Sequence, residues 1–221
     1  MKTKLILTLL IGISTLSFSQ NSSNIDRNKL RNYYLINKFN DTTQVYSETM
    51  KIEELHCGFD LYDKNGHSTN LSVNPELCKY LLFINSNGRT VKLKSVPVKK
   101  RIRGCLKKSV FMLVLIENSD QDFKNGKVDF YSHKYTHMDR YKFGAHEYAE
   151  IGVRRVSSEI YYFKDLNGLH QISFKYQFER FPKILGKKLY KKMIQSDKGE
   201  KQFLLDYFTE YNENITTVAN K

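Results

Sequence analysis

Cationic side chains crowd one acid-free stretch of this chain, and they are the residues best suited to bind an anion. The sequence has no Asp or Glu between Glu76 and Glu117, whereas ten Lys and Arg residues lie in that interval. The whole chain has 36 basic and 23 acidic residues, a net charge of +13. Such a concentration raises the local electrostatic potential and attracts phosphate, sulfate or carboxylate groups. The ten residues are Lys79, Arg89, Lys92, Lys94, Lys99, Lys100, Arg101, Arg103, Lys107 and Lys108.

Part of this stretch is predicted to engage an acidic partner. Lys92 and Lys94 alternate with apolar residues in a predicted strand over 89–96, so they lie on its solvent face. The other cations of the candidate site follow in a loop. The candidate partners are an acidic polysaccharide, a lipid phosphate or an acidic protein surface, and nucleic acid is not expected. The alternative is a solvated edge whose lysines discourage aggregation. The candidate ligand-binding residues are Lys92, Lys94, Lys99, Lys100, Arg101 and Arg103.

A histidine cluster offers a second chemistry. His133, His137 and His146 lie close together in the sequence, and neutral imidazoles so placed are zinc ligands, with Asp139 or Glu150 as a further oxygen ligand. The run from His146 to Glu150 comes close to the helix motif of zinc proteases, but it ends in Glu where that motif has His. Zinc is thus the only cofactor that the sequence suggests, and a zinc-dependent hydrolase is the alternative function. The competing interpretation is a set of polar surface histidines.

The chain has three cysteines, Cys57, Cys78 and Cys105. In an oxidising compartment two of them can pair, and we favour Cys57 with Cys78, because the enclosed segment contains a turn at Asn65-Gly66. The alternative is three buried thiols that never pair. The sequence has no CxxC, which argues against a thioredoxin-like motif and a zinc ribbon.

Residues 1–19 have the pattern of a signal peptide. Lys2 and Lys4 precede an apolar core over 5–13, and small residues follow before position 20. The apolar run is too short to span a bilayer of about 30 Å. We therefore expect export to the periplasm or the extracellular space, with no transmembrane segment in the mature chain.

Turn signals organise the rest of the chain. Four Asn-Gly pairs favour the positive φ angles of hairpin turns. The segments 80–85 and 89–96 predict one hairpin, and 159–164 with 170–178 predict another. The unbroken apolar run 110–116 indicates a central buried strand.

Helices are predicted only near the two ends. A short helix is expected over 26–38, and two amphipathic segments, 183–196 and one that follows Gly199, predict a C-terminal helical hairpin within 182–216. The predicted fold class is α+β: an antiparallel, hairpin-rich sheet or open barrel over roughly 44–180, with helices at both ends. Residues 20–221 are predicted to form a single domain.

No nucleophile elbow, P-loop or dinucleotide-binding motif occurs in the chain. We therefore favour an exported soluble binding protein over an enzyme, with the basic stretch as its binding region. A structural envelope protein without a ligand is the remaining alternative.

Overall fold

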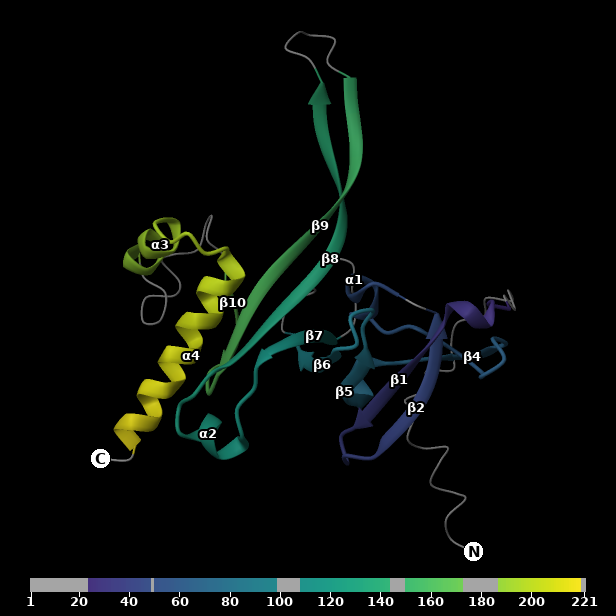
Figure 1. The fold of residues 1–221 in the computed structure, drawn as a ribbon, viewed down its shortest axis with the longest axis horizontal. Helices are drawn as coiled ribbons and strands as arrows, with labels where there is room; N and C mark the ends of the chain where they lie inside the picture. The colour runs from purple at the N-terminus through teal and green to yellow at the C-terminus, as the bar shows by residue number, and fades with distance from the viewer. Residues whose placement is uncertain (1–23, 49, 99–107, 144–149, 173–186, 220–221) are drawn as a thin grey trace, which may run out of the picture. The chain divides into compact units, whose positions relative to one another are not determined.

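The computed structural model describes residues 24–48, 50–98, 108–143, 150–172 and 187–219 (Figure 1). Ten strands form an open antiparallel sheet in the order β10-β9-β8-β7-β6-β5-β1-β2-β3-β4. The strands are β1 Leu30–Asn37, β2 Thr42–Glu48, β3 Asp60–Tyr62, β4 Ser68–Ser72, β5 Cys78–Ile84, β6 Thr90–Pro97, β7 Ser109–Ile116, β8 Asp129–Phe143, β9 Glu150–Asp165 and β10 Gly168–Ile172. The helices are α1 Ile52–Leu55, α2 Asp120–Lys124, α3 Lys187–Ile194 and α4 Glu200–Ala219, and the 3-10 turns are η1 Arg27–Lys29 and η2 Pro75–Leu77.

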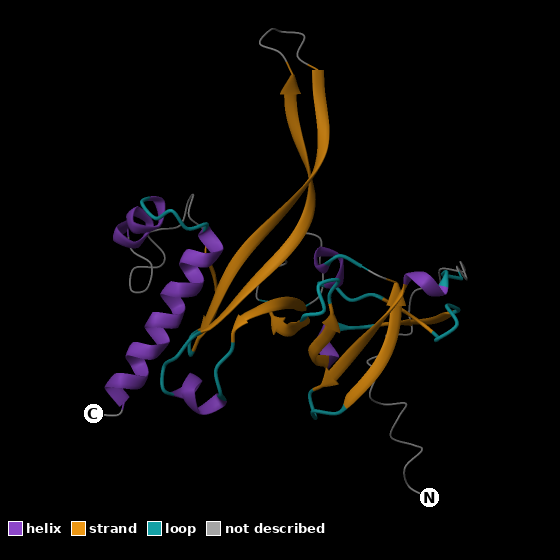
Figure 2. Ribbon diagram, in the orientation of Figure 1, coloured by secondary structure: helices purple, strands orange, loops and turns teal. Residues whose placement is uncertain are grey.

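The chain divides into two compact units. Unit 1 comprises residues 1–113 and 134–158, and unit 2 comprises residues 114–133 and 159–221. Strands dominate the described part of unit 1, whereas both long helices, α3 and α4, belong to unit 2 (Figure 2). None of the described helices combines the length and the apolar character that a bilayer crossing requires.

Unit 1 has a core on one face of its sheet. Alternate residues point into it, such as Leu35 on β1, Leu81 on β5 and Leu93 on β6, each at most 6% exposed. Leu55 of α1 is fully buried in the same cluster. Because side chains alternate along a strand, the residues between these core positions lie on the opposite face of the sheet.

Unit 2 has its own core beneath α4, which runs beside β9 and β10 (Figure 1). The ring centroid of Phe208 lies 4.9 Å from that of Phe130 on β8 and 5.6 Å from that of Phe163 on β9. Asn212 fixes the helix further, because its side chain accepts a bond from the backbone N–H of Val128 at 2.8 Å and donates to its carbonyl at 3.0 Å. Both backbone groups of a buried residue are thereby satisfied.

Three of the four Asn-Gly pairs form the predicted hairpin turns. They connect β3 to β4, β5 to β6 and β9 to β10, and their glycines, Gly66, Gly88 and Gly168, have positive φ angles. The fourth pair ends α2 instead, with Asn125 as the C-cap and Gly126 at φ 98° just beyond. Glycine suits either position, because it adopts positive φ without strain.

The predicted strands 80–85, 89–96 and 110–116 are confirmed as β5, β6 and β7. The helix predicted over 26–38 is wrong: only the short turn η1 forms there, and β1 follows. Tyr33 and Leu35 are buried and alternate with exposed residues, which is the burial pattern of a strand. Two C-terminal helices are present as α3 and α4, while residues 173–186 lie outside the described part of the chain. The C-terminal pairing of helices and the single-domain prediction stay predictions.

Candidate functional site

The hairpin of β5 and β6 places two lysines over one tyrosine. Tyr80 pairs with Lys94 across the hairpin, and Leu82 pairs with Lys92 one step along it. The ammonium nitrogen of Lys92 lies 4.3 Å from the centre of the Tyr80 ring, and that of Lys94 lies 5.9 Å from it. Both distances are within the range of a cation–π interaction, in which the ring's negative face attracts the ammonium group.

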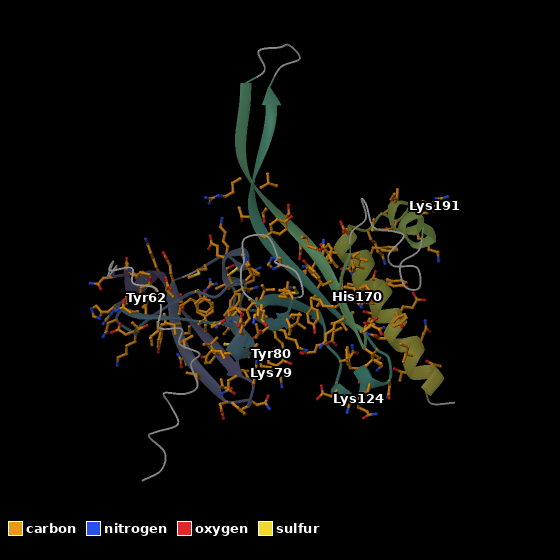
Figure 3. All side chains as sticks on the ribbon, turned by 180° about the vertical axis from the view of Figure 1, so that it is seen from behind. Tyr62, Lys79, Tyr80, Lys124, His170 and Lys191 are labelled. Carbon is orange, nitrogen blue, oxygen red and sulfur yellow. The ribbon has the colours of Figure 1, made fainter. Side chains whose placement is uncertain are left out.

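A β-bulge brings in a third lysine. Ile36 of β1 pairs with Tyr80, but its neighbour Asn37 pairs with Cys78, so Lys79 is an extra residue on β5. The bulge turns Cys78 toward the core and leaves Lys79 beside Tyr80 (Figure 3). The Lys79 ammonium nitrogen lies 5.5 Å from the Tyr80 ring centre and donates to Oδ1 of Asn40 at 2.8 Å. Three cations therefore gather at one ring.

Further tyrosines share this side of the sheet. They lie on β1, β2 and β3, at positions that alternate with core residues. Tyr34 is 38% exposed and the others are half-buried. We call this surface the lysine–tyrosine face; its residues are Lys79, Lys92, Lys94, Tyr80, Tyr34, Tyr46 and Tyr62.

Carboxylates are kept to the margins of the lysine–tyrosine face. The central rows of paired residues contain none; they read Lys94–Tyr80–Ile36–Thr42 and Lys92–Leu82–Tyr34–Gln44. Glu48 and Asp60 lie at the end remote from the lysines, on β2 and β3, and Asp41 lies in the turn between β1 and β2. The two central rows therefore include the positive charges of Lys92 and Lys94 and no negatively charged residue.

The sequence-predicted binding residues are only partly described. Lys92 and Lys94 are confirmed on the side opposite the core, because Val91 and Leu93 between them are buried. The other four predicted residues, Lys99, Lys100, Arg101 and Arg103, lie outside the described residues. Sequence analysis did not anticipate the part played by Lys79 and Tyr80, since simple alternation puts Lys79 on the core side.

No family model, curated protein or solved structure matches this chain. What the lysine–tyrosine face can bind must therefore be inferred from its own side chains.

The predicted zinc site is not assembled by the described residues, which hold no group of three metal-ligating side chains. His133 lies on β8 and is 1% exposed. The side chain of His137 and the whole of His146 lie outside the described residues.

A hydrogen-bond network surrounds Asp129 on β8. The Tyr131 hydroxyl donates to Oδ2 of buried Asp129 at 2.7 Å, and Oδ1 of Asp129 accepts from the backbone N–H of Asn118 at 2.9 Å. This network ties β8 to the end of β7, which is a structural role.

The predicted disulfide between Cys57 and Cys78 is wrong. Cys78 is a free, buried thiol, whereas Cys57 is disulfide-bonded, and Cys105 lies outside the described residues. The bulge explains the error, because it turns Cys78 into the core of unit 1. Burial raises the pKa of the Cys78 thiol to about 11, despite the opposing positive charge of Lys38. Such a thiol is protonated and unreactive near neutral pH.

Unit 2 also carries an acidic pair, formed by Glu159 on β9 and Glu200 at the start of α4. Burial raises the pKa of Glu200, and the negative charge of Glu159 raises it further. The Lys201 ammonium nitrogen lies 3.1 Å from Oε1 of Glu159. This ion pair links α4 to β9, and the arrangement is therefore accounted for by packing of the helix on the sheet.

Proposed function

We propose that this protein is an exported binding protein that holds an anionic partner against its lysine–tyrosine face. The observation that carries the proposal is the gathering of three lysine ammonium groups around the ring of Tyr80. The negative face of the ring offsets part of the repulsion between these cations and keeps them at one place. Cations ordered in advance lose little conformational entropy when an anion binds.

The sequence supports the same region. Lys92 and Lys94 belong to the acid-free stretch, and the cationic run 99–103 follows β6 within a few residues. Export, proposed from residues 1–19, narrows the partner to anions of the periplasm or the extracellular space: an acidic polysaccharide, a lipid phosphate or an acidic protein surface. A zinc hydrolase is not proposed, because only one of its predicted ligands, His133, has a described side chain.

The proposal is tested with heparin as the probe polyanion. We expect the double variant Lys92→Gln/Lys94→Gln to bind heparin about fivefold to thirtyfold more weakly, since an exposed ion pair is worth roughly 0.5–1 kcal/mol. The matched control is Lys191→Gln/Lys192→Gln on α3, which removes the same charge from exposed positions of unit 2. Dissociation constants are measured by isothermal titration at several salt concentrations.

If heparin binds at the lysine–tyrosine face, Lys92→Gln/Lys94→Gln weakens heparin binding more than Lys191→Gln/Lys192→Gln does. We also expect the first variant to show a shallower dependence of affinity on salt, because fewer counterions are exchanged when two contacts are lost. Equal weakening in both variants would show that binding follows net charge alone, and the proposal would then be abandoned.

A further inference from the structure

Four neighbouring strands of unit 1 each place one tyrosine on the lysine–tyrosine face. Going from the lysines outward, these residues are Tyr80 on β5, Tyr34 on β1, Tyr46 on β2 and Tyr62 on β3. Tyr34 pairs with Leu82, two residues beyond Tyr80, and Tyr46 pairs directly with Tyr62. The tyrosines thus lie along a diagonal across β5, β1 and β2, and the last of them lies directly opposite on β3. We call this row of four residues the tyrosine track.

The length of this tyrosine track follows from sheet geometry. Neighbouring strands lie about 4.8 Å apart and two residues advance about 6.8 Å, so each diagonal step is roughly 8 Å. The whole track from Tyr80 to Tyr62 spans about 20 Å by the same spacing. A surface of this length suits an extended polymer better than a single small anion.

The side chains along the track suit a sugar polymer. Tyr34 is 38% exposed, and an aromatic ring packs well on the C–H face of a sugar. Exposed polar side chains lie beside it at Asn32, Thr42 and Gln44, and the Gln44 amide is 3.3 Å from the Tyr46 hydroxyl. Amides and hydroxyls both donate and accept, as sugar hydroxyls require.

The lysine end suits the acidic group of such a sugar. Its three cations are all lysines, which act as point charges and do not impose the bidentate geometry with which arginine grips phosphate. At the opposite end Glu48 and Asp60 repel an anion. The face is therefore polarised, with charge recognition near Tyr80 and neutral contacts along the rest of the track.

Other anions fit less well. Bases of a single-stranded nucleic acid need open ring faces for stacking, but the Lys92 ammonium already covers the Tyr80 ring at 4.3 Å. A lipid surface calls for several exposed apolar side chains, and within the described rows of the face Ile84, at 58% exposure, is the one apolar residue that is more than half exposed.

We infer that the partner is an acidic polysaccharide of uronic-acid type, bound as an extended chain with its sugar rings along the tyrosine track and the carboxylates of the sugars at one end of the bound segment at the lysines. This inference rests on the proposed function, and it adds the class of ligand and the direction in which the ligand lies.

The experiment uses polygalacturonate as the probe and compares three single variants of the exported chain. We expect Tyr34→Ala to weaken binding about threefold to tenfold, through loss of the ring contact. Tyr34→Phe retains the ring and is expected to keep most of the affinity. Phe39→Ala is the matched control, because it removes the ring of a residue that is 82% exposed in the β1–β2 turn. Circular dichroism checks that each variant is folded.

The outcomes separate the inference from the proposed function. Weakening by Lys92→Gln/Lys94→Gln without any effect of Tyr34→Ala would overturn the inference and leave the anion site standing. No effect of either change would overturn both. Tighter binding of a 20-nucleotide oligothymidylate or of phosphatidylglycerol vesicles than of polygalacturonate would also overturn the inference. Loss of binding on methyl esterification of polygalacturonate is expected, because the ester removes the carboxylate charge.

Discussion

At the scale of single residues, the arrangement of the three lysines depends on Tyr80. Its ring carries no charge, yet Lys79 from the bulge in β5 and Lys92 and Lys94 from β6 all lie close to it. Without the ring the ammonium groups would spread apart, because like charges repel and lysine side chains are flexible. Tyr80 is therefore a positioning residue, which acts on an anion through the lysines.

Replacing Tyr80 tests this role. We expect Tyr80→Leu to weaken heparin binding about twofold to fivefold, since an exposed cation–π contact is worth about 0.5–1 kcal/mol. The slope of affinity against salt concentration stays unchanged, because every cation is still present. Titration calorimetry at four salt concentrations measures both quantities.

Tyr80→Phe is the control for this prediction, as it keeps the ring face and loses only the hydroxyl. It is expected to bind heparin like the parent protein. If Tyr80→Phe weakens binding as much as Tyr80→Leu does, the hydroxyl and not the ring face is responsible, and the positioning role is lost.

Single residues also explain what sequence reasoning missed. The alternation of Lys92 and Lys94 with apolar residues was sufficient to place both lysines correctly. The same alternation could not place Lys79 and Cys78, because a bulge inserts one residue into the strand and so exchanges the sheet faces on which these two side chains lie. A bulge is set by the pairing of distant strands and leaves no regular sequence pattern.

At the scale of elements, the Asn-Gly turns fix the strand register of unit 1. Before the β3–β4 turn, Asp63 accepts from the backbone N–H of His67 at 3.0 Å and of Asn65 at 2.7 Å. These bonds, that from His67 first, lower the pKa of Asp63 to about 2. Because the pKa is lower in the folded state, the carboxylate stabilises the turn above pH about 4, and this contribution is lost as the pH falls toward 2.

The glycines of these turns provide a matched pair of substitutions. Gly66 has φ +90°, and a Cβ there would lie 2.1 Å from the carbonyl oxygen of Ile25; Gly88 has φ +71° and no atom within 4 Å of that position. We expect Gly88→Ala to destabilise the protein by about 1–2 kcal/mol through backbone strain alone. Gly66→Ala is expected to lower the free energy of unfolding by clearly more, as measured by urea denaturation. Equal losses would mean that the contact with Ile25 is absent in solution.

Elements with strong local signals were predicted well and the others poorly. The hairpin of β5 and β6 has a turn signal between two alternating segments, and the run 110–116 is apolar throughout. The segment 26–38 has apolar residues at spacings that a helix also satisfies. Its strand conformation is decided by pairing with β2 and β5, and that pairing is a tertiary effect that no local pattern contains.

At the scale of the whole molecule, the described residues build two cores with different chemistry. The core of unit 1 is a sheet face of aliphatic and aromatic residues, and that of unit 2 is an aromatic cluster capped by α4. The clusters share no buried residue. The lysine–tyrosine face belongs entirely to unit 1, so its geometry depends on the first core.

Truncating one side chain in each core tests whether the units are stabilised separately. Phe208→Ala is expected to destabilise by about 3–5 kcal/mol and Leu81→Ala by about 2–5 kcal/mol, as both side chains are fully buried. If each core stabilises its own unit, Phe208→Ala speeds hydrogen exchange in α4 and β10 while β1, β2 and β5 keep their protection, and Leu81→Ala does the reverse. Hydrogen exchange read by mass spectrometry resolves these segments. Heparin binding should then survive Phe208→Ala and fall in Leu81→Ala; equal acceleration of exchange in both units by either variant would show instead that they unfold as one.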